Sequence, residues 1–83
     1  MKSVTYSKAA IKVLKRMPRN VAQRVMEKVN QYARDPASQA NNTKALTGSD
    51  LVRLRVGDGR VIMDDNGIVL AVLKIGSRGN VYE

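Results

Sequence analysis

Three side chains in the last third of the sequence could together act on a phosphodiester. Arg60 lies near the start of the segment GRVIMDDNGIVLAVLKIGSRGNVYE, and Arg78 and Tyr82 lie close to its end. RNA carries its own nucleophile, the 2′-hydroxyl, so its cleavage needs a base for that hydroxyl, stabilisation of the charge on phosphorus and a proton for the leaving oxygen. Guanidinium and phenol groups are able to serve such a reaction, but the same residues could also be ordinary surface and packing side chains.

The composition restricts what other chemistry the chain could perform. The 83 residues include no histidine and no cysteine, which excludes a histidine base, a thiolate zinc site and a disulfide bond. Catalysis would have to use Arg, Lys, Tyr, Asp or Glu, and we expect neither a metal ion nor another cofactor. Asp64 and Asp65 belong to the sequence DDNG, which is typical of a turn, and receive no catalytic role.

The net charge of +8 and the isoelectric point near 10.3 predict attraction to a polyanion, either nucleic acid or an acidic protein. The charge is concentrated in residues 1–34, where Glu27 is the single acidic residue among nine Lys and Arg residues. The helical cations expected to attract RNA are Lys12, Lys15, Arg16 and Lys28. The alternative is a solvated helical face, but such a face usually has acidic partners four residues away, and they are missing here.

The N-terminal residues predict a short strand followed by a helix. Val4–Tyr6 has an extended pattern, and Ser7 stands where the N-cap of a helix would be. The apolar side chains expected on one face of this helix are Ile11, Leu14 and Met17. Pro18 ends the helix because proline interrupts helical hydrogen bonding.

A second helix is expected to begin near Arg19 and to end at Asp35-Pro36. Its buried residues follow a spacing of three or four and are Val21, Val25, Val29 and Tyr32. The two helices would form a helical hairpin. The following segment, Ala37–Asp50, is rich in Asn, Ser, Thr and Gly and predicts an ordered surface loop that carries Lys44.

From Leu51 onwards the pattern changes to the alternation of β-strands. The expected core-facing residues are Val52, Leu54 and Val56, and the residues expected on the opposite face are Leu51, Arg53 and Arg55. The segments Gly57–Gly59 and Asp64–Gly67 predict turns, which leave strands at Arg60–Met63 and at Ile68–Ile75, the latter expected in the centre of the sheet.

Residues 1–83 therefore predict a single domain, because so short a chain cannot fill a second core. The expected class is α+β, with an N-terminal helical hairpin packed on one face of a small, twisted antiparallel sheet. Arginine side chains would occupy the other face of that sheet.

In their order and spacing, three motifs resemble the RelE/ParE toxin superfamily. They are L-x-G at Leu46–Gly48, the sequence LVRLRVGDGRVI at Leu51–Ile62 and the sequence IGSRGNVY at Ile75–Tyr82. Together with the preceding helices they cover nearly the whole chain. The chain departs from the RelE branch at Leu51, where a basic residue is frequent, and at Met63-Asp64, where an aromatic residue usually follows the strand.

The resemblance implies the toxin of a type II toxin–antitoxin module and, for the RelE-like branch, a ribosome-dependent endoribonuclease that cleaves messenger RNA without a metal ion. Its catalytic residues, carried over by motif, would be Arg60, Arg78 and Tyr82. Arg60 would clamp the phosphorane, because a guanidinium group matches two phosphate oxygens. Tyr82 would accept the 2′-proton, since neighbouring guanidinium groups favour the phenolate. Arg78 would hold the scissile phosphate or assist the leaving group.

Further contacts with RNA are expected from the sheet face and the loop. Arg53 and Arg55 would face the RNA on the open face of the sheet, and Lys44 would touch a phosphate from the loop. The alternative for all three is a role in solubility alone, which is the commoner one for exposed basic residues.

The resemblance also implies partners, namely a cognate antitoxin in a toxin–antitoxin hetero-oligomer, the ribosome and messenger RNA. Two alternatives stay open: a ParE-like inhibitor of DNA gyrase without enzymatic activity, and a catalytically inactive relative that binds nucleic acid. The joint presence of the two arginines and the tyrosine favours the nuclease. No segment has the apolar length of a signal peptide or a membrane span, so a cytoplasmic location and no membrane contact are expected.

Overall fold

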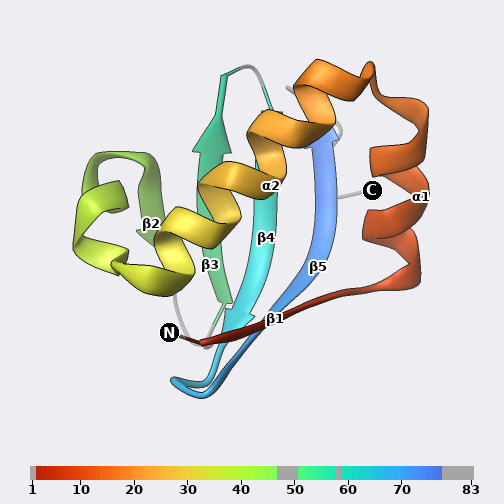
Figure 1. Ribbon diagram of the computed structural model, residues 1–83. Helices are drawn as coiled ribbons and strands as arrows, with labels where there is room; N and C mark the ends of the chain where they lie inside the picture. The colour runs from red at the N-terminus through yellow and green to blue at the C-terminus, as the bar shows by residue number, and fades with distance from the viewer. Residues whose placement is uncertain (1, 47–50, 58, 78–83) are drawn as a thin grey trace.

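The computed structural model describes residues 2–46, 51–57 and 59–77, which form a five-stranded sheet with both helices on one of its faces (Figure 1). The strands are β1 (Ser3–Tyr6), β2 (Thr43–Ala45), β3 (Leu51–Val56), β4 (Gly59–Asp65) and β5 (Val69–Ser77). Their order across the sheet is β1-β5-β4-β3-β2. The expected α+β class is confirmed. In these residues, no helix has the length and apolar character that crossing a membrane would require.

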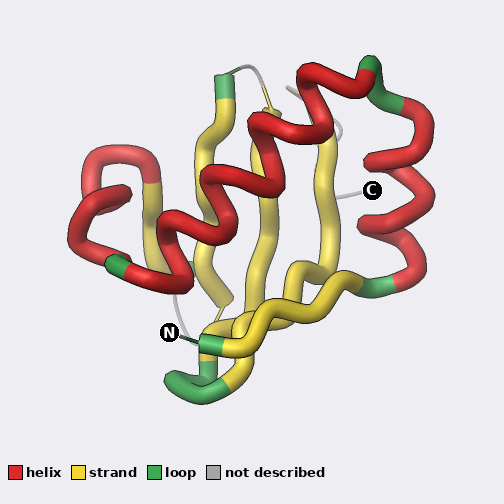
Figure 2. The backbone as a smooth tube through the Cα atoms, in the orientation of Figure 1, coloured by secondary structure: helices red, strands yellow, loops and turns green. Residues whose placement is uncertain are grey.

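The sheet is mixed, whereas a wholly antiparallel sheet was expected. The N-terminal strand β1 pairs in parallel with β5, from Ser3 opposite Val69 to Tyr6 opposite Val72, and the other neighbouring strands are antiparallel. The chain leaves β1 through the helices on one face and returns to the sheet far from it, so β1 is free to pair beside β5. Consequently β4, and not β5, occupies the middle of the sheet (Figure 2).

The first helix, α1 (Lys8–Arg16), begins as expected at Ser7. The Ser7 hydroxyl oxygen accepts a hydrogen bond from the Ala10 N–H at 3.0 Å and donates its proton to the Leu73 carbonyl at 2.6 Å, which ties the cap to β5. The expected burial of Ile11 is wrong, since its side chain is 41% exposed. The face toward the sheet is instead the one that contains buried Ala10 together with half-buried Leu14 and Met17, because the small alanine lets the helix approach β5 closely.

The second helix, α2 (Arg19–Arg34), crosses the sheet obliquely (Figure 1). Its buried residues are Ala22, Val25, Val29, Tyr32 and Ala33, so three of the four expected core residues are confirmed. Val21 is 38% exposed, contrary to expectation. On a helical projection Val21 lies at the margin of this buried stripe, about 70° from its centre, whereas the two alanines fall inside it.

The expected surface loop over 37–50 contains regular structure. A 3₁₀-helix, η1 (Pro36–Asn42), leads into β2, which pairs with β3 and places Lys44 on a strand. Residues 47–50 lie outside the described part of the chain. The segment is held by polar rather than apolar contacts: Gln39 is only 5% exposed, and its Nε2 donates to Gln31 Oε1 at 2.9 Å. Hydrophobic periodicity cannot reveal an element of this kind.

The turn after β4 is anchored by a cluster that joins three distant parts of the chain. Asp65 Oδ2 accepts hydrogen bonds from Lys2 Nζ at 2.7 Å and from the Tyr32 hydroxyl at 2.8 Å, while its Oδ1 accepts from the Gly67 N–H at 3.0 Å. Burial raises the pKa of Tyr32 to about 12, with further contributions from the hydrogen bond to Asp65 and its charge. The hydrogen bonds to Asp65 hold this residue in place at the end of strand β4, which extends to Asp65, beyond the expected end at Met63.

These contacts make folding stability depend on pH. Burial tends to raise the pKa of Asp65, but the hydrogen bonds from Lys2, Gly67 and Tyr32 outweigh burial and lower it. A carboxyl group whose pKa is lower in the folded state stabilises the fold above its unfolded pKa of about 4 and loses that effect as the pH falls through the folded value. The protein should therefore lose stability below about pH 4 through this cluster.

We predict that Asp65→Asn lowers the melting temperature at pH 7 and flattens its decline in acid. A hydrogen bond to a charged group contributes about 1.5–3 kcal/mol, and each kcal/mol corresponds to about 4–8 °C in a domain of this size. Thermal melts from pH 7 to pH 2 measure both effects. Asp64→Asn, on the opposite face of the same strand, is the control; equal losses in the two variants would contradict a special role for Asp65.

Candidate nucleic-acid interface

In the described residues, the face of the sheet that the helices leave uncovered carries five basic side chains, one of which is Lys74 of β5, the cross-strand partner of Ile62. Leu54 and Val56 are buried in the core under α2, so the alternation of β3 turns Arg53 and Arg55 to the open face. The register then places Lys44 of β2 and Arg60 of β4 on the same face. We call Lys44, Arg53, Arg55 and Arg60 the sheet-face cations.

These cations stand directly opposite one another across neighbouring strands. Lys44 is the cross-strand partner of Arg53, and Arg55 is the partner of Arg60. Like charges in directly opposed positions destabilise a sheet, by roughly 0.2–1 kcal/mol for a pair. Neither Arg55 nor Arg60 forms an ion pair with a described residue. The arrangement therefore costs stability and is suited to an anionic ligand that bridges the strands.

The sheet-face cations line one hollow of about 280 Å³. Its other wall is formed by Asn41, Asn42 and Thr43, at the end of η1 and the start of β2. No acidic side chain of residues 2–46, 51–57 and 59–77 lines it, so within this part of the chain an anion would meet only positive and neutral groups. Arg53 and Arg60 are half-buried, so neighbouring residues pack against the aliphatic part of each side chain. Lys44 and Arg55 are exposed.

Of the three expected catalytic residues, only Arg60 belongs to the described part of the chain. Arg78 and Tyr82 lie outside it, so their grouping with Arg60 remains a prediction. Arg60 pairs across the sheet with Gly76, which precedes Arg78 by two positions in the sequence. Among residues 2–46, 51–57 and 59–77, no three acidic side chains gather as they would around a metal ion.

Comparison with known proteins identifies the family. The family model described as the ParE toxin of the type II toxin–antitoxin system parDE matches residues 4–82. This chain belongs to the ParE toxin family. It is thus a toxin of a type II toxin–antitoxin system and a member of the RelE/ParE superfamily, as its motifs indicated. A search among curated proteins found no match.

Solved structures of RelE toxins share the fold of this ParE-family chain. The archaeal RelE–RelB complex from Pyrococcus horikoshii OT3 is 28% identical, covers 96% of this chain and 98% of that one, and has a TM-score of 0.74. The RelBE2 complex from Mycobacterium tuberculosis is similar in fold, with 21% identity, coverage of 93% of this chain and 98% of that one, and a TM-score of 0.74. The intact RelBE complex from E. coli is also similar in fold, with 19% identity, coverage of 96% of this chain and 100% of that one, and a TM-score of 0.74.

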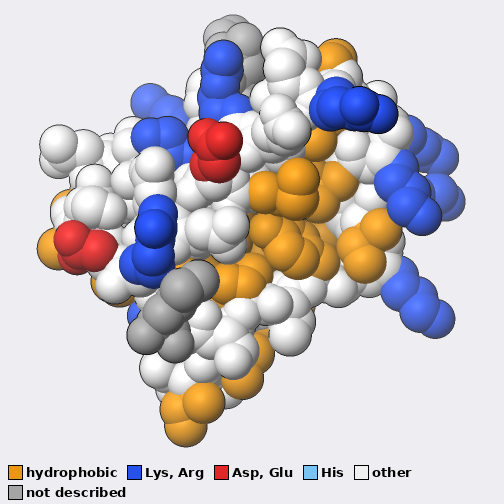
Figure 3. Space-filling view, viewed as in Figure 1, with side chains coloured by type: hydrophobic (Ala, Val, Ile, Leu, Met, Phe, Trp, Pro, Cys, Tyr) orange, Lys and Arg blue, Asp and Glu red, His pale blue; other side chains and the backbone are white. Residues whose placement is uncertain are grey.

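The helical cations of this toxin form a separate basic surface. Lys12, Lys15 and Arg16 are exposed on α1, and Lys28 is half-buried on α2. Since the helices cover the face opposite the sheet-face cations, the structure does not bring these two groups into one site. Figure 3, which views the helix-bearing face, shows Lys and Arg side chains gathered over α1 and an apolar area between the helices.

A second hollow of about 310 Å³ adjoins Arg60, at the end of the sheet beneath the start of α2. Its apolar lining residues are Met17, Val21, Val25, Val56, Val61 and Ile75. Arg24, which sequence reasoning missed, lines the same hollow. Arg60 therefore contributes to two surfaces of different character, one basic and one apolar.

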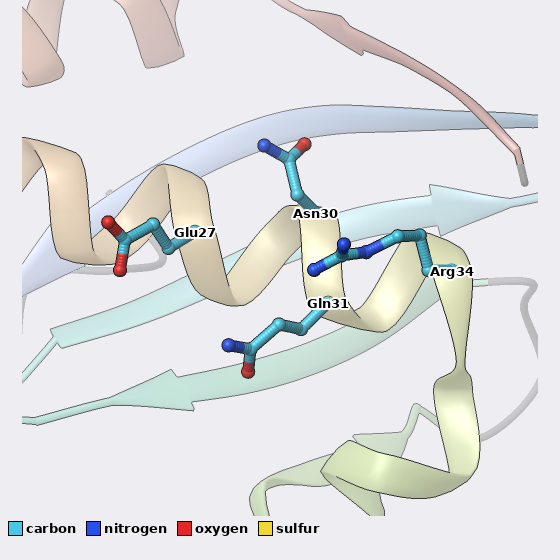
Figure 4. A pocket seen from close by; sticks show the side chains of 4 residues that line it. All are labelled: Glu27, Asn30, Gln31 and Arg34. Atoms are coloured by element: carbon cyan, nitrogen blue, oxygen red, sulfur yellow. The ribbon is translucent and has the colours of Figure 1, made fainter.

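A third hollow, of about 380 Å³, lies on the outer side of α2 and is lined by Glu27, Asn30, Gln31 and Arg34. Figure 4 shows that all four side chains come from this one helix and that Arg34 points back along it. Glu27 gives this surface an acidic group, whereas the described residues that line the hollow beside the sheet-face cations include none. It is therefore less suited to a polyanion.

The opposed arginines allow a direct test of the stability cost. Arg55→Gln and Arg60→Gln should each raise the free energy of unfolding by up to about 1 kcal/mol, because each removes the same repulsion. The double variant should therefore gain less than the sum of the two single gains. Urea denaturation of the four proteins measures this coupling, with Lys12→Gln on α1 as the control. Additive gains would show that the two guanidinium groups do not interact.

Proposed function

We propose that this toxin is a ribosome-dependent endoribonuclease that cleaves messenger RNA by attack of the 2′-hydroxyl, without a metal ion. The observation that supports this most is the row of directly opposed sheet-face cations, which is unfavourable for folding and favourable for holding a phosphodiester backbone. Phosphate contacts of this kind position a nucleic acid. The RelE folds that the chain resembles agree with the proposal.

In the proposed reaction the sheet-face cations would hold the RNA backbone over β3 and β4. Arg60 would stabilise the charge on the pentacoordinate phosphorus through two parallel hydrogen bonds. Tyr82 would take the proton of the 2′-hydroxyl, and Arg78 would hold the scissile phosphate or assist the departure of the 5′-oxygen. The helical cations would add long-range attraction to the ribosome, because α1 and α2 carry much of the net charge.

The proposed protein partner is a cognate antitoxin with an acidic, amphipathic segment. The solved RelE structures named above are complexes with antitoxins. Such a segment would suit the basic surface of this chain by charge complementarity.

A second candidate function is ParE-like inhibition of DNA gyrase without catalysis, which the matching family model favours. Two assays with the purified toxin separate the candidates: mapping of messenger cleavage on translating ribosomes, and supercoiling by purified gyrase. Cleavage without an effect on gyrase supports the proposal. Inhibited supercoiling with intact messenger would refute it in favour of the second candidate.

For the nuclease we predict that Arg60→Ala slows single-turnover cleavage of ribosome-bound messenger by about a hundredfold or more, since such a contact contributes roughly 2–4 kcal/mol to the transition state. Arg60→Lys should recover only part of the loss, because an ammonium group cannot form the paired contact. Tyr82→Phe should also slow cleavage. Combined with Arg60→Ala it should slow cleavage less than the product of the two separate effects, because both groups act on one transition state.

Melting temperatures are the control for these variants. Rates that fall in proportion to the melting temperature would assign the residues to folding and not to the reaction. A Tyr82→Phe protein that cleaves at the wild-type rate would assign the phenol to packing.

The helical cations are tested separately from the reaction. Replacing Lys12, Lys15, Arg16 and Lys28 by Gln should weaken ribosome binding and flatten its dependence on salt, because fewer counterions are released. The rate of the cleavage step on bound messenger should change little. Affinity and salt dependence equal to those of the wild type would show that α1 and α2 do not contact the ribosome.

A further inference from the structure

The basic hollow is also lined by side chains of a different chemistry, which we call the asparagine wall. Asn41 and Asn42 end η1 beside Lys44, Arg53 and Arg55. An amide offers a hydrogen-bond donor and an acceptor about two ångströms apart, whereas guanidinium and ammonium groups only donate. The hollow thus combines groups that hold phosphates with groups that could distinguish bases.

One of the two asparagines, Asn42, is held in place by a buried glutamine. Gln39 Nε2 donates to Gln31 Oε1 of α2 at 2.9 Å, and Gln39 Oε1 accepts from Asn42 Nδ2 at 3.3 Å. The hydroxyl of Thr43 donates to the Gln39 carbonyl at 3.0 Å. These bonds connect the end of η1 to α2 and to β2. The Asn42 amide is therefore preformed in the fold, which lowers the entropic cost of binding through it.

The amides also retain capacity for further hydrogen bonds. Asn42 uses one donor of its amide in the bond to Gln39, which leaves its Oδ1 and its second N–H. Asn41 is exposed and makes no side-chain hydrogen bond to a described residue. Asn42 satisfies the Oε1 atom of the buried Gln39, whereas Asn41 satisfies no buried group, so folding alone does not account for the place of Asn41 beside the cations.

We propose that Asn41 and Asn42 contact base edges of the RNA whose phosphates the sheet-face cations hold, and that they give the toxin a preference for adenine. The proposal rests on the proposed function. Phosphate contacts carry no sequence information, so selectivity must come from groups that reach the bases. Adenine offers an amino donor beside a ring-nitrogen acceptor on both of its edges, the pattern that an asparagine amide matches with two bonds, whereas uracil has no amino group.

Single-stranded RNA suits this arrangement. Its base edges are not occupied by a complementary strand, and unstacked bases can stack on guanidinium planes where aromatic rings are lacking. Among the described residues no aromatic side chain lines the hollow, but Arg53, Arg55 and Arg60 do. A nucleotide could therefore place its base between these arginines and the asparagine wall.

The test uses the full chain and short labelled homopolymers of 2′-O-methyladenosine and 2′-O-methyluridine, in which the attacking hydroxyl is blocked. Fluorescence anisotropy at several salt concentrations gives the affinity and its salt dependence. We expect the wild type to bind the adenosine oligomer about fivefold more tightly or better, at the lower end of the discrimination typical of one two-bond contact. Asn41→Ala together with Asn42→Ala should bring the two affinities close to equal while leaving the salt dependence unchanged.

Three further variants make the test specific. Arg55→Gln should weaken both oligomers equally and reduce the salt dependence, as a phosphate contact would. Asn30→Ala, on the outer side of α2, should change nothing. Asn41→Ala alone should lower the preference for adenosine in part. Because Asn41 makes no side-chain hydrogen bond to a described residue, the melting temperature of this variant should equal that of the wild type.

The outcomes separate the inference from the proposed function. A wild type that binds neither oligomer would overturn the inference, whereas the nuclease proposal, which requires the ribosome, is decided by the messenger-cleavage assay. Binding with no preference for adenosine, or a preference that survives in the double asparagine variant, would overturn the inference and leave the nuclease proposal standing. Loss of preference in the asparagine variants with a retained salt dependence would support it.

Discussion

In the described residues the helices cover one face of the five-stranded sheet only, and the rest of the structure follows from this constraint. The buried cluster gathers residues of α1 and α2 and the helix-facing side chains of β3, β4 and β5. No helix remains for the other face in the described residues. That face carries the sheet-face cations, together with Ile62, which is only 4% exposed. The core and the candidate site are thus two sides of the same strands.

The candidate site destabilises the fold near the start of β4, and contacts at the end of the same strand offset this loss of stability. Near its start, Arg60 faces Arg55 across the sheet, a contact that opposes folding. At its end, Asp65 binds Lys2 and Tyr32 and so joins β4 to the N-terminal residues and to α2. Since β4 lies in the middle of the sheet, the same strand holds the repulsive pair and the cluster that secures the fold. A site that costs stability is compatible with a small domain when the strand that carries it is anchored elsewhere.

Much of this architecture could be predicted because its signals are local. Ser7 caps α1, Pro18 separates the helices, and the alternation of β3 separates core from cations. Three features could not be predicted from the sequence. The parallel pairing of β1 depends on contacts more than sixty residues apart, η1 depends on hydrogen bonds of Gln39, and the burial of Ala10 in place of Ile11 depends on how closely α1 approaches β5. Hydrophobic periodicity predicts the buried face of a helix to within one residue. Ala10 and Ile11 are neighbours in the sequence, so an error of one residue is enough to predict burial of the wrong one.

The site was predicted in part for the same reason. Arg53, Arg55 and Arg60 could be placed on one face because strand alternation and the tight turn between β3 and β4 determine their register. Lys44 was assigned to a loop, and its position directly opposite Arg53 depends on β2, whose three residues are too few for a pattern. Asn41 and Asn42 gave no signal at all, because an Asn pair in a polar segment is ordinarily part of a turn. Their position became meaningful only when η1 was seen to bring them against the sheet. Thus the strands specify where a phosphate would bind, and the short polar segment after α2 determines what else the bound ligand meets.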